Sequence, residues 1–450
     1  MSEKEMNITR RDLLIKGVQM AGGIAALTSM GGLLSACAKV VTNNNGTVTG
    51  LIFQTWTSDA KEVIDTQIAQ FKKINPNLNV SLQILSYDDY WKKLPISISG
   101  GTGPDLFIMT RPNFETFAKS NQAANITQEV KNSAKLQENL ANMNSVFVQT
   151  YQFKGETRGI PFGVDCTGIV YNKTLIQKEG LKLPSEMEKT WSWNELRDYA
   201  VKLTKRSGDQ ITQYGYFVST NRMPTFEYIW SNGGELFNPA GDQCTIASKE
   251  AIQAIQFYAD LMLKDKVSPT PDFTKSQSSD DLFMSGKIVM MNAGNWTMAK
   301  YRGIKDFEWD VAELPSSPNT GKKFVSSNVL GYIVGPNTKA KKEIIALLEQ
   351  LTTKESQQVY AEKGVYIPTR TDAQEPFFNS DTPKNLKAFQ RALSYSKPMA
   401  LSEWVSYPEV LRITGNAMEQ ILSGKVPVEQ GMKSAEDEIN KIIKENKAKG

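Results

Sequence analysis

The sequence predicts an α/β protein of two lobes that follows an export leader. The chain has 450 residues, which is too long for one ordinary hydrophobic core and suits two. Predicted strands and helices alternate along it, as they do in mostly parallel sheets with helices on both faces. Apolar residues make up 40% of the chain and charged residues 22%, so the composition is that of a globular protein.

A strand, a helix and two further strands open the folded part. Residues 48–54 are apolar and β-prone, and the capping-box spacing of Asp59 and Glu62 predicts the start of an amphipathic helix. Residues 78–84 alternate between apolar and polar side chains, as a strand with one buried face does. Residues 105–109 form the next predicted strand.

The rest of the chain continues this alternation. Ser192 and Glu195 form another capping box before a helix, and Gly364 is placed to end a later one. The other predicted elements are strands at 168–171 and 288–291 and helices at 196–203, 252–262, 341–351, 353–363 and from 428 onward.

The chain contains no histidine and only three cysteines. Ser–His, Cys–His and His–metal chemistry are therefore excluded, and we expect no metal and no cofactor. Carboxylate-pair catalysis stays open, because Asp and Glu are plentiful. An exported location would permit a disulfide between Cys166 and Cys244, but two distant cysteines do not imply one.

The positive charge of the chain is spread along the sequence. The formal net charge is +4 at pH 7. A nucleic-acid-binding protein concentrates Lys and Arg on one face. We therefore expect no nucleic-acid partner.

The first residues resemble a bacterial export signal that ends in a lipidation site. An Arg-Arg pair precedes a weakly apolar stretch at 18–34, which ends in Leu-Ser-Ala-Cys, a tetrad that resembles a lipobox. We expect residues 1–36 to be a signal peptide of the twin-arginine type, Cys37 to carry the lipid, and residues 37–47 to be a flexible tether. The alternatives are a transmembrane helix beside a chance cysteine and export by the general secretory route.

Several short segments occur in an order that is typical of one protein family. They are 71–76 (FKKINP), 86–90 (SYDDY), 100–105 (GGTGPD), 159–165 (GIPFGVD), 171–173 (YNK), 190–196 (TWSWNEL), 283–287 (FMSGK), 294–296 (GNW) and 364–368 (GVYIP). Each is weak alone. Together they make the chain resemble the family 1 extracellular solute-binding proteins of bacterial ABC importers, of the maltose-binding-protein type.

This resemblance implies a two-lobed, periplasmic-binding-protein-like fold. A ligand cleft would lie between the lobes, and the hinge would consist of two or three chain crossings. Lobe 1 is expected to take residues 48–158 and 296–340. Lobe 2 is expected to take residues 159–295 and 341–450.

Tryptophans in loops are the strongest candidates for contact with a sugar, which buries its C–H faces on aromatic rings. Trp56 follows the first strand, where open α/β sheets bind ligands. Trp230 precedes a turn that contains Asn232 and Gly233, and Trp296 follows Gly294 and Asn295. Trp404 lies in a proline-flanked segment. The alternative for each tryptophan is a place in the core.

Two aspartates and several polar residues complete the candidate set. Asp105 either contacts the ligand or caps a turn, and Asp165 either contacts the ligand or fixes the hinge. The resemblance adds further candidates, which are Asn295, Asn328, Tyr332, Tyr366 and Arg370. The family's usual paired glycines before Tyr332 are replaced here by Asn328-Val-Leu-Gly331, which departs from the pattern of that cleft wall.

The function implied by the resemblance is that of a receptor and not of an enzyme. The chain would be a monomeric, lipid-anchored protein on the outer face of the cell membrane. It would capture a carbohydrate, either an oligosaccharide or a related polyol, and deliver it to the permease subunits of an ABC importer. The alternatives are a non-sugar solute (a glycerol phosphodiester, a polyamine or a peptide-like molecule) and an exported carbohydrate-active enzyme that uses a carboxylate pair.

Overall fold

A computed structural model describes residues 41–42, 48–187, 189–220, 222–379, 381–398 and 402–449. The expected signal peptide, the lipidation site Cys37 and most of the expected tether lie outside these residues. Within the described part of the chain, no helix is both long and apolar enough to cross a membrane.

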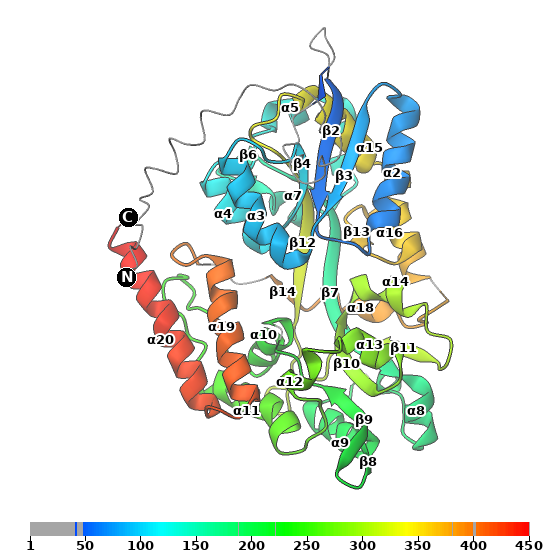
Figure 1. Cartoon of the computed structure of the whole chain (residues 1–450), viewed down its shortest axis with the longest axis vertical. Coiled ribbons are helices and arrows are strands. Elements are labelled where there is room, and N and C mark those ends of the chain that lie inside the picture. Colours follow the sequence, from blue (N-terminus) through cyan, green and yellow to red (C-terminus); the bar gives the residue numbers. More distant parts are fainter. Residues whose placement is uncertain are drawn as a thin grey trace, which may run out of the picture. The chain divides into compact units, whose positions relative to one another are not determined.

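Twelve of the described strands form one mixed sheet, in which two long strands, β7 and β12, run side by side (Figure 1). The main strand order is β1-β2-β4-β12-β7-β10-β9-β8. Strand β3 pairs with β2, β14 with β12, and β11 and β13 both pair with β7. The strands are β1 (Val41–Thr42), β2 (Val48–Thr55), β3 (Asn79–Ile84), β4 (Leu106–Thr110), β7 (Ile160–Asn172), β8 (Lys205–Ser207), β9 (Gln210–Phe217), β10 (Ile288–Gly294), β11 (Trp309–Ala312), β12 (Val325–Val334), β13 (Ile367–Pro368) and β14 (Ser396–Pro398).

One half of this sheet carries the core of lobe 1. Strand β2 runs parallel to β3 and β4, and β12 is antiparallel to β4. All five residues of β4 are buried, as expected for a strand covered on both faces. The helices of this lobe are α2 (Lys61–Ile74), α3 (Tyr87–Ser99), α4 (Arg111–Lys119), α5 (Thr127–Asn132), α6 (Ala134–Ala141), α7 (Ser145–Gln149), α15 (Lys341–Leu351) and α16 (Lys354–Lys363), with a small hairpin of β5 (Gln152–Phe153) and β6 (Glu156–Thr157).

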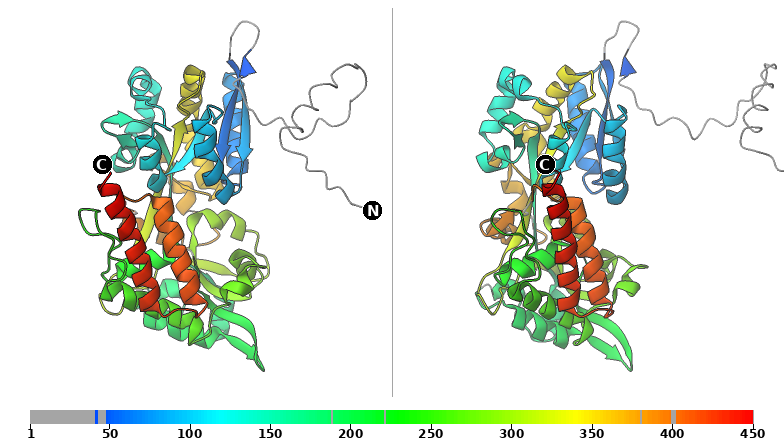
Figure 2. Two further views of the ribbon diagram at one scale, coloured as in Figure 1. Left: turned by 60° about the vertical axis from the view of Figure 1, so that its left-hand side comes forward. Right: turned by 90° about the vertical axis from the view of Figure 1, so that its left-hand side faces the viewer.

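The other half of the sheet carries the core of lobe 2. Strand β10 is antiparallel to β7 and parallel to β9. The long helices α19 and α20 lie side by side on this lobe (Figure 2). Its helices are α8 (Lys173–Lys178), η1 (Pro184–Glu186), α9 (Trp193–Leu203), α10 (Arg222–Ser231), α11 (Lys249–Leu263), α12 (Pro271–Thr274), α13 (Ser279–Met284), η2 (Asn295–Thr297), α14 (Met298–Tyr301), η3 (Thr371–Ala373), α17 (Glu375–Phe378), α18 (Lys387–Leu393), α19 (Tyr407–Leu422) and α20 (Val428–Lys447).

The buried clusters divide the chain differently from the expected lobe boundaries. Leu347 and Tyr360, on α15 and α16, belong to the core of lobe 1, whereas residues 341–450 were expected in lobe 2. Met298 and Trp309 belong to the core of lobe 2, whereas residues 296–340 were expected in lobe 1. The physical reason is that the chain returns to lobe 1 along β12, about thirty residues after Trp296.

The chain crosses between the two cores three times within the described residues. Along β7, Phe162 packs in lobe 1 and Val164 in lobe 2. Strand β12 crosses in the opposite direction, and the third crossing lies between Tyr366 of lobe 1 and Ile367 of lobe 2. This arrangement agrees with the expected hinge of two or three crossings.

The local signals for helix ends have mixed outcomes. The capping box of Ser192 and Glu195 is present at the start of α9, and Gly364 ends α16 with a φ of 68°. The capping box expected at Asp59 is wrong, because α2 begins at Lys61 and Ala60 takes the N-cap position with no side-chain bond. The short strand expected at 168–171 is part of the longer β7, which is buried throughout.

Candidate functional site

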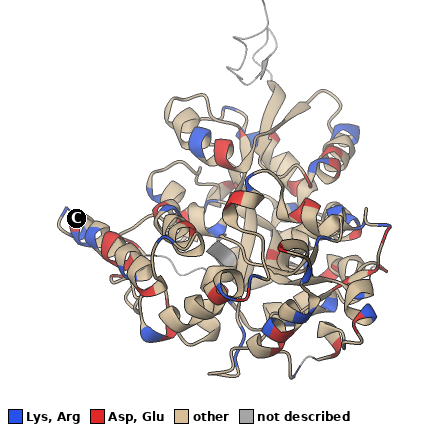
Figure 3. Cartoon of the chain, turned by 60° about the horizontal axis from the view of Figure 1, so that its bottom comes forward, with Lys and Arg blue, Asp and Glu red and all other residues tan. Residues whose placement is uncertain are grey.

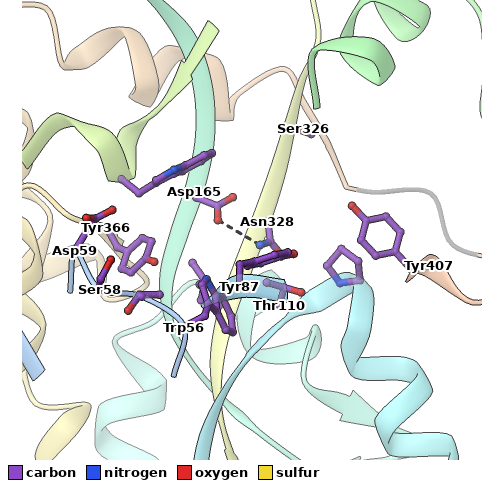
Figure 4. A pocket seen from close by; sticks show the side chains of 14 residues that line it. Trp56, Ser58, Asp59, Tyr87, Thr110, Asp165, Ser326, Asn328, Tyr366 and Tyr407 are labelled. Carbon is purple, nitrogen blue, oxygen red and sulfur yellow. Dashed lines mark hydrogen bonds between the residues drawn. The ribbon is translucent and has the colours of Figure 1, made fainter. Parts of the chain in front are cut away.

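A cavity of about 310 Å³ lies between the two lobes, next to the hinge strands (Figure 4). Lobe 1 supplies one wall and lobe 2 the other, and β7 and β12 supply the floor. We call this cavity the cleft. Its lining residues are Trp56, Thr57, Ser58, Asp59, Tyr87, Thr110, Pro112, Asp165, Trp296, Ser326, Asn328, Leu330, Tyr366 and Tyr407.

The wall from lobe 1 is built where parallel strands end, which is where open α/β sheets place ligands. Strand β2 ends at Thr55, and Trp56 follows it directly. The Trp56 ring lies 5.8 Å from Tyr87, 5.0 Å from Tyr90 and 5.3 Å from Trp91 between ring centroids. Because these contacts restrict the indole ring, the aromatic wall is assembled before any solute arrives.

The wall from lobe 2 depends on Trp296, whose backbone follows β10 of lobe 2 and whose ring packs against the core of lobe 1. It also depends on a glycine two residues earlier. A β-carbon placed on Gly294 would lie 2.0 Å from Cζ3 of the Trp296 ring, so the ring occupies space that only glycine leaves open. Asn295, the residue between them in the sequence, is fully buried, and its side chain accepts a 2.9 Å hydrogen bond from the Cys166 backbone N–H of β7. Together these contacts fix the direction of the Trp296 ring relative to β7.

The floor of the cleft joins the two hinge strands through side chains. Asn328 on β12 donates a 3.2 Å hydrogen bond from Nδ2 to Asp165 Oδ2 on β7 (Figure 4). The side-chain Oδ1 of Asn328 accepts a 3.1 Å hydrogen bond from the Arg111 backbone N–H at the start of α4. Asn328 therefore connects the floor to the wall of lobe 1.

The charges at the cleft mouth face one another across the two lobes. The pKa of Asp59 in lobe 1 is raised by partial burial and by the negative charge of Asp280 in lobe 2, while Lys300 of lobe 2 opposes the shift. Lys300 pairs with Asp280 at 3.1 Å. Elsewhere, Lys and Arg are interspersed with Asp and Glu along the helices seen in Figure 3.

The structure brings five of the sequence-predicted residues together in the cleft. They are Trp56, Asp165, Trp296, Asn328 and Tyr366. They come from the wall of lobe 1, from the three crossings and from the start of η2. Asp165 lines the cavity and also accepts the Asn328 hydrogen bond across the hinge strands. Its contact with a ligand stays a prediction.

The predicted cluster around Trp230 lies away from the cleft. Trp230 is 2% exposed and packs in the core of lobe 2. Asn232 is buried too, and it donates a 2.8 Å bond to the Glu250 carbonyl and accepts one of 2.8 Å from the Ser317 hydroxyl. Gly233 has a φ of 91°, which the turn after α10 requires. We therefore leave all three out of the proposed site.

Three further candidates have structural partners within the fold. Asp105 is 3% exposed and accepts hydrogen bonds from the Ile52 N–H at 2.9 Å and the Thr338 hydroxyl at 2.6 Å. The Tyr332 ring stacks on Phe162 inside lobe 1, with centroids 4.3 Å apart. The buried positions of Asp105 and Tyr332 remove them from the proposed site, as does that of Asn295, whose side chain is hydrogen-bonded to the backbone of β7.

Arg370 and Trp404 also lie outside the cleft. Arg370 pairs with Asp372 at 2.9 Å and donates to Asn139 of lobe 1. Trp404 lines a neighbouring groove of about 430 Å³, which shares Pro112 and Tyr407 with the cleft. Cys166 and Cys244 are buried free thiols.

Several residues of the cleft were not among the sequence candidates. They are Thr57, Ser58, Asp59, Tyr87, Thr110, Pro112, Ser326, Leu330 and Tyr407. Their signal was position rather than residue type, because many of them follow the ends of β2 and β4 or start α3. Asp59 was hidden because it fitted a helix cap in the sequence. Within the described residues, no group of three Asp, Glu or Cys side chains is arranged to hold a metal ion.

Comparison with known proteins identifies the family. The sequence profile of the bacterial extracellular solute-binding proteins matches residues 54–358. The chain belongs to this family. As a member of an extracellular family, it is an exported protein that binds a solute.

Two relatives and one solved structure illustrate the similarity. A Brucella abortus (strain 2308) protein, named only as a binding protein, is 23% identical over 381 residues, which cover 83% of this chain and 88% of the relative. The multiple sugar-binding protein of Streptococcus mutans is 22% identical over 353 residues and covers 75% and 79% of the two chains. The ABC substrate-binding protein of Listeria monocytogenes, solved with cycloalternan, superposes with a TM-score of 0.79 at 23% identity, covering 87% of this chain and 98% of that one. The shared fold confirms the two-lobed α/β architecture.

Proposed function

We propose that this protein captures a neutral oligosaccharide in the cleft and delivers it to the permease of an ABC importer. One observation carries the proposal. The cleft combines five aromatic side chains with hydroxyl, amide and carboxylate groups in a single cavity of about 310 Å³. This combination matches the apolar C–H faces and polar hydroxyl edges of a sugar.

The charges of the cleft favour a neutral solute over an anionic one. Asp59 and Asp165 are the charged side chains of the lining, and the described lining residues include no Lys or Arg. Phosphate and carboxylate ligands need cationic groups nearby. A sugar hydroxyl, in contrast, can donate a hydrogen bond to a carboxylate without carrying charge.

The relatives support a carbohydrate ligand through their own names. The S. mutans relative is named as a multiple sugar-binding protein, and the L. monocytogenes protein was solved in complex with cycloalternan. Two stacked rings and several neutral hydrogen bonds would give an affinity of roughly micromolar, which corresponds to about −8 kcal/mol.

Closure of the two lobes on the solute would provide the signal for delivery. A solute that touches Trp56 of lobe 1 and Trp296 of lobe 2 stabilises the form in which these walls approach each other. We propose that the protein acts as a monomer and that the permease recognises its closed form. In this proposal the protein leaves the covalent bonds of the solute unchanged. If the protein converts an oligosaccharide into products, it is instead an enzyme that uses carboxylates.

The same proposal includes the lipid anchor. The Leu-Ser-Ala-Cys tetrad supports lipidation of Cys37, and the preceding Arg-Arg pair supports export by the twin-arginine route. The lipid, such as palmitate, would hold the protein on the extracytoplasmic face of the cell membrane. Cys37→Ala is expected to release the protein into the soluble fraction. Unchanged membrane attachment of this variant would contradict the lipid anchor.

A binding screen tests the choice of solute. Maltotriose, cycloalternan, arabinooligosaccharides and polyols would be compared with sn-glycerol 3-phosphate and spermidine, first by thermal shift and then by calorimetry. We expect a neutral saccharide to raise the melting temperature. Binding of glycerol phosphate or spermidine alone would contradict the proposal.

A matched pair of variants locates the binding. Trp56→Ala removes an aromatic ring from the cleft and is expected to weaken binding of the selected saccharide by about 1–3 kcal/mol. Phe273→Ala removes an exposed ring of α12 that does not line the cleft and is expected to leave affinity unchanged. Equal effects of both substitutions would show that the solute binds elsewhere.

A further inference from the structure

A carboxylate lies buried directly behind the floor of the cleft. Glu227 on α10 is 1% exposed. Its Oε1 accepts hydrogen bonds from the Ser326 backbone N–H at 2.9 Å, from the Ser326 hydroxyl at 3.1 Å and from the Thr167 hydroxyl. Its Oε2 accepts a 3.3 Å bond from the Asn292 amide. One carboxylate thus connects three strands, β12, β7 and β10, and the first two are hinge strands.

The groups that donate to Glu227 also line the space for the solute. Ser326 lines the cleft. Thr167 and Asn292 line an adjoining cavity of about 200 Å³, which shares Trp296 with the cleft. A hydroxyl that gives its only hydrogen to Glu227 keeps just its lone pairs for another partner. The protonation state of Glu227 therefore determines whether the Ser326 and Thr167 hydroxyls accept or donate a hydrogen bond toward a solute.

We propose that Glu227 is a positioning residue that determines specificity, because its ionised carboxylate holds the Thr167 and Ser326 hydroxyls as hydrogen-bond acceptors toward the solute. This inference rests on the proposed function. A solute rich in hydroxyl hydrogens, such as an oligosaccharide, matches a floor of acceptors. A solute that offers only acceptors does not.

Protonation of Glu227 would reverse this pattern. The new carboxyl O–H needs an acceptor, and the Ser326 N–H can only donate. The Asn292 amide cannot turn without cost, because its carbonyl already accepts a 2.6 Å bond from the Tyr216 hydroxyl. One of the two hydroxyls must then accept the carboxyl proton and turn its own hydrogen elsewhere. The floor loses an acceptor and gains a donor.

The surroundings of Glu227 set the pH at which this change occurs. Burial raises the pKa of Glu227 to about 7, although its hydrogen bonds from Thr167, Ser326 and Asn292 oppose the shift. The titratable groups around it are the Cys166 thiol on β7 and the phenols of Tyr216, Tyr228 and Tyr258 on β9, α10 and α11. Burial raises the pKa of each of these groups, so they stay neutral near pH 7. The nearby cation Lys397 of β14, whose backbone pairs with that of Ser326, forms an ion pair with Glu235.

The test is the pH dependence of affinity in the full chain. Calorimetry with maltotriose, cycloalternan and arabinooligosaccharides would be run from pH 5.5 to pH 8.5. We expect the bound saccharide to bind about tenfold more tightly at the high end, with a midpoint near pH 7, since one charge-assisted interaction is worth about a factor of ten. Glu227→Gln is expected to abolish this pH dependence.

Two further sets of variants keep the test decisive. Ser326→Ala with Thr167→Val removes both hydroxyls but retains the Ser326 N–H, and should also flatten the profile, which covers the case that Glu227→Gln does not fold. Asp59→Asn removes the carboxylate of the cleft lining whose pKa is raised by partial burial and by Asp280, and it should leave the midpoint near pH 7 in place. A flat profile in the wild type, or an unchanged profile in Glu227→Gln or in the double variant, would overturn this inference alone. Failure of every saccharide to bind at any pH would overturn the proposed function and this inference together.

Discussion

Lobe 2 contains two segments in which a tryptophan lies close to a glycine at the end of an element, and their indole rings have opposite surroundings. Trp230 is the penultimate residue of helix α10 and is 2% exposed in the core. Trp296 follows strand β10 and lines the cleft. The type of element before each turn explains the difference.

The helix directs Trp230 inward because it continues a buried stripe. Phe226 lies four residues earlier on the same helical face, with its ring 6.2 Å from that of Trp230. Strand β10 instead ends at Gly294, two residues before Trp296 of the cleft lining. There Gly294 leaves room for the Trp296 ring to fold back over the backbone. Gly233 therefore allows the backbone turn after α10, whereas Gly294 leaves the space that the Trp296 ring occupies.

The largest effect is expected from removing the buried ring of Trp230, and it is an effect on stability. Trp230→Ala should lower the free energy of unfolding by about 3–5 kcal/mol, because it empties a large space in a packed core. Saccharide affinity of the folded fraction should stay within about twofold of the wild type. Denaturant unfolding and calorimetry measure the two quantities, and a large loss of affinity with normal stability would return Trp230 to the binding site.

Helix α10 also carries Glu227, which should make stability depend on pH. Its folded-state pKa is raised from 4.5 to about 7, so the folded chain binds more protons than the unfolded chain between these values. The contribution of Glu227 to the free energy of unfolding should therefore fall as the pH rises from about 4.5 to 7, by at most about 3 kcal/mol. Thermal unfolding of Glu227→Gln across this range should show a shallower decline than the wild type, and equal slopes would argue against a protonated, buried Glu227.

Trp296→Ala should act on affinity rather than on stability. Loss of a half-buried ring at the cleft is expected to weaken saccharide binding by about 1–3 kcal/mol. Trp404→Ala is the matched control, because Trp404 is also half-buried but lines the neighbouring groove. An equal loss in the control would mean that the solute extends into that groove.

The smallest change, Gly294→Ala, isolates the position of the ring. The backbone at Gly294, with φ −89° and ψ 157°, accepts alanine without strain, so the added methyl group acts only by displacing Trp296. We expect affinity to fall by about 1–2 kcal/mol, nearly as far as in Trp296→Ala. Gly415→Ala makes the same substitution on α19, where nothing lies within 4 Å of the new methyl group, and should leave binding unchanged. Wild-type affinity in Gly294→Ala would show that saccharide binding does not depend on the position of the Trp296 ring.

The sequence was sufficient for most elements and for part of the cleft. The alternation of apolar residues predicted β3, because this pattern is local in the sequence. The ordered family segments predicted the two-lobed fold, because they act together along most of the chain. Trp56 was found because it follows a strand end.

The remaining features depend on contacts distant in sequence. The choice between core and cleft for Trp230 depends on the helical face that α10 buries. Asp105 is bonded to Thr338, 233 residues away, and no local pattern reveals that partner. The lobe boundary was misplaced because only packing shows that α15 and α16 return to lobe 1.

A crystal structure of the protein with the saccharide selected by the binding screen tests the central claim most directly. We predict that the sugar lies in the cleft between Trp56 and Trp296, with hydroxyl groups within hydrogen-bond distance of Asp165 and Asn328. A saccharide bound only outside the cleft, with Trp56 and Trp296 untouched, would contradict the account.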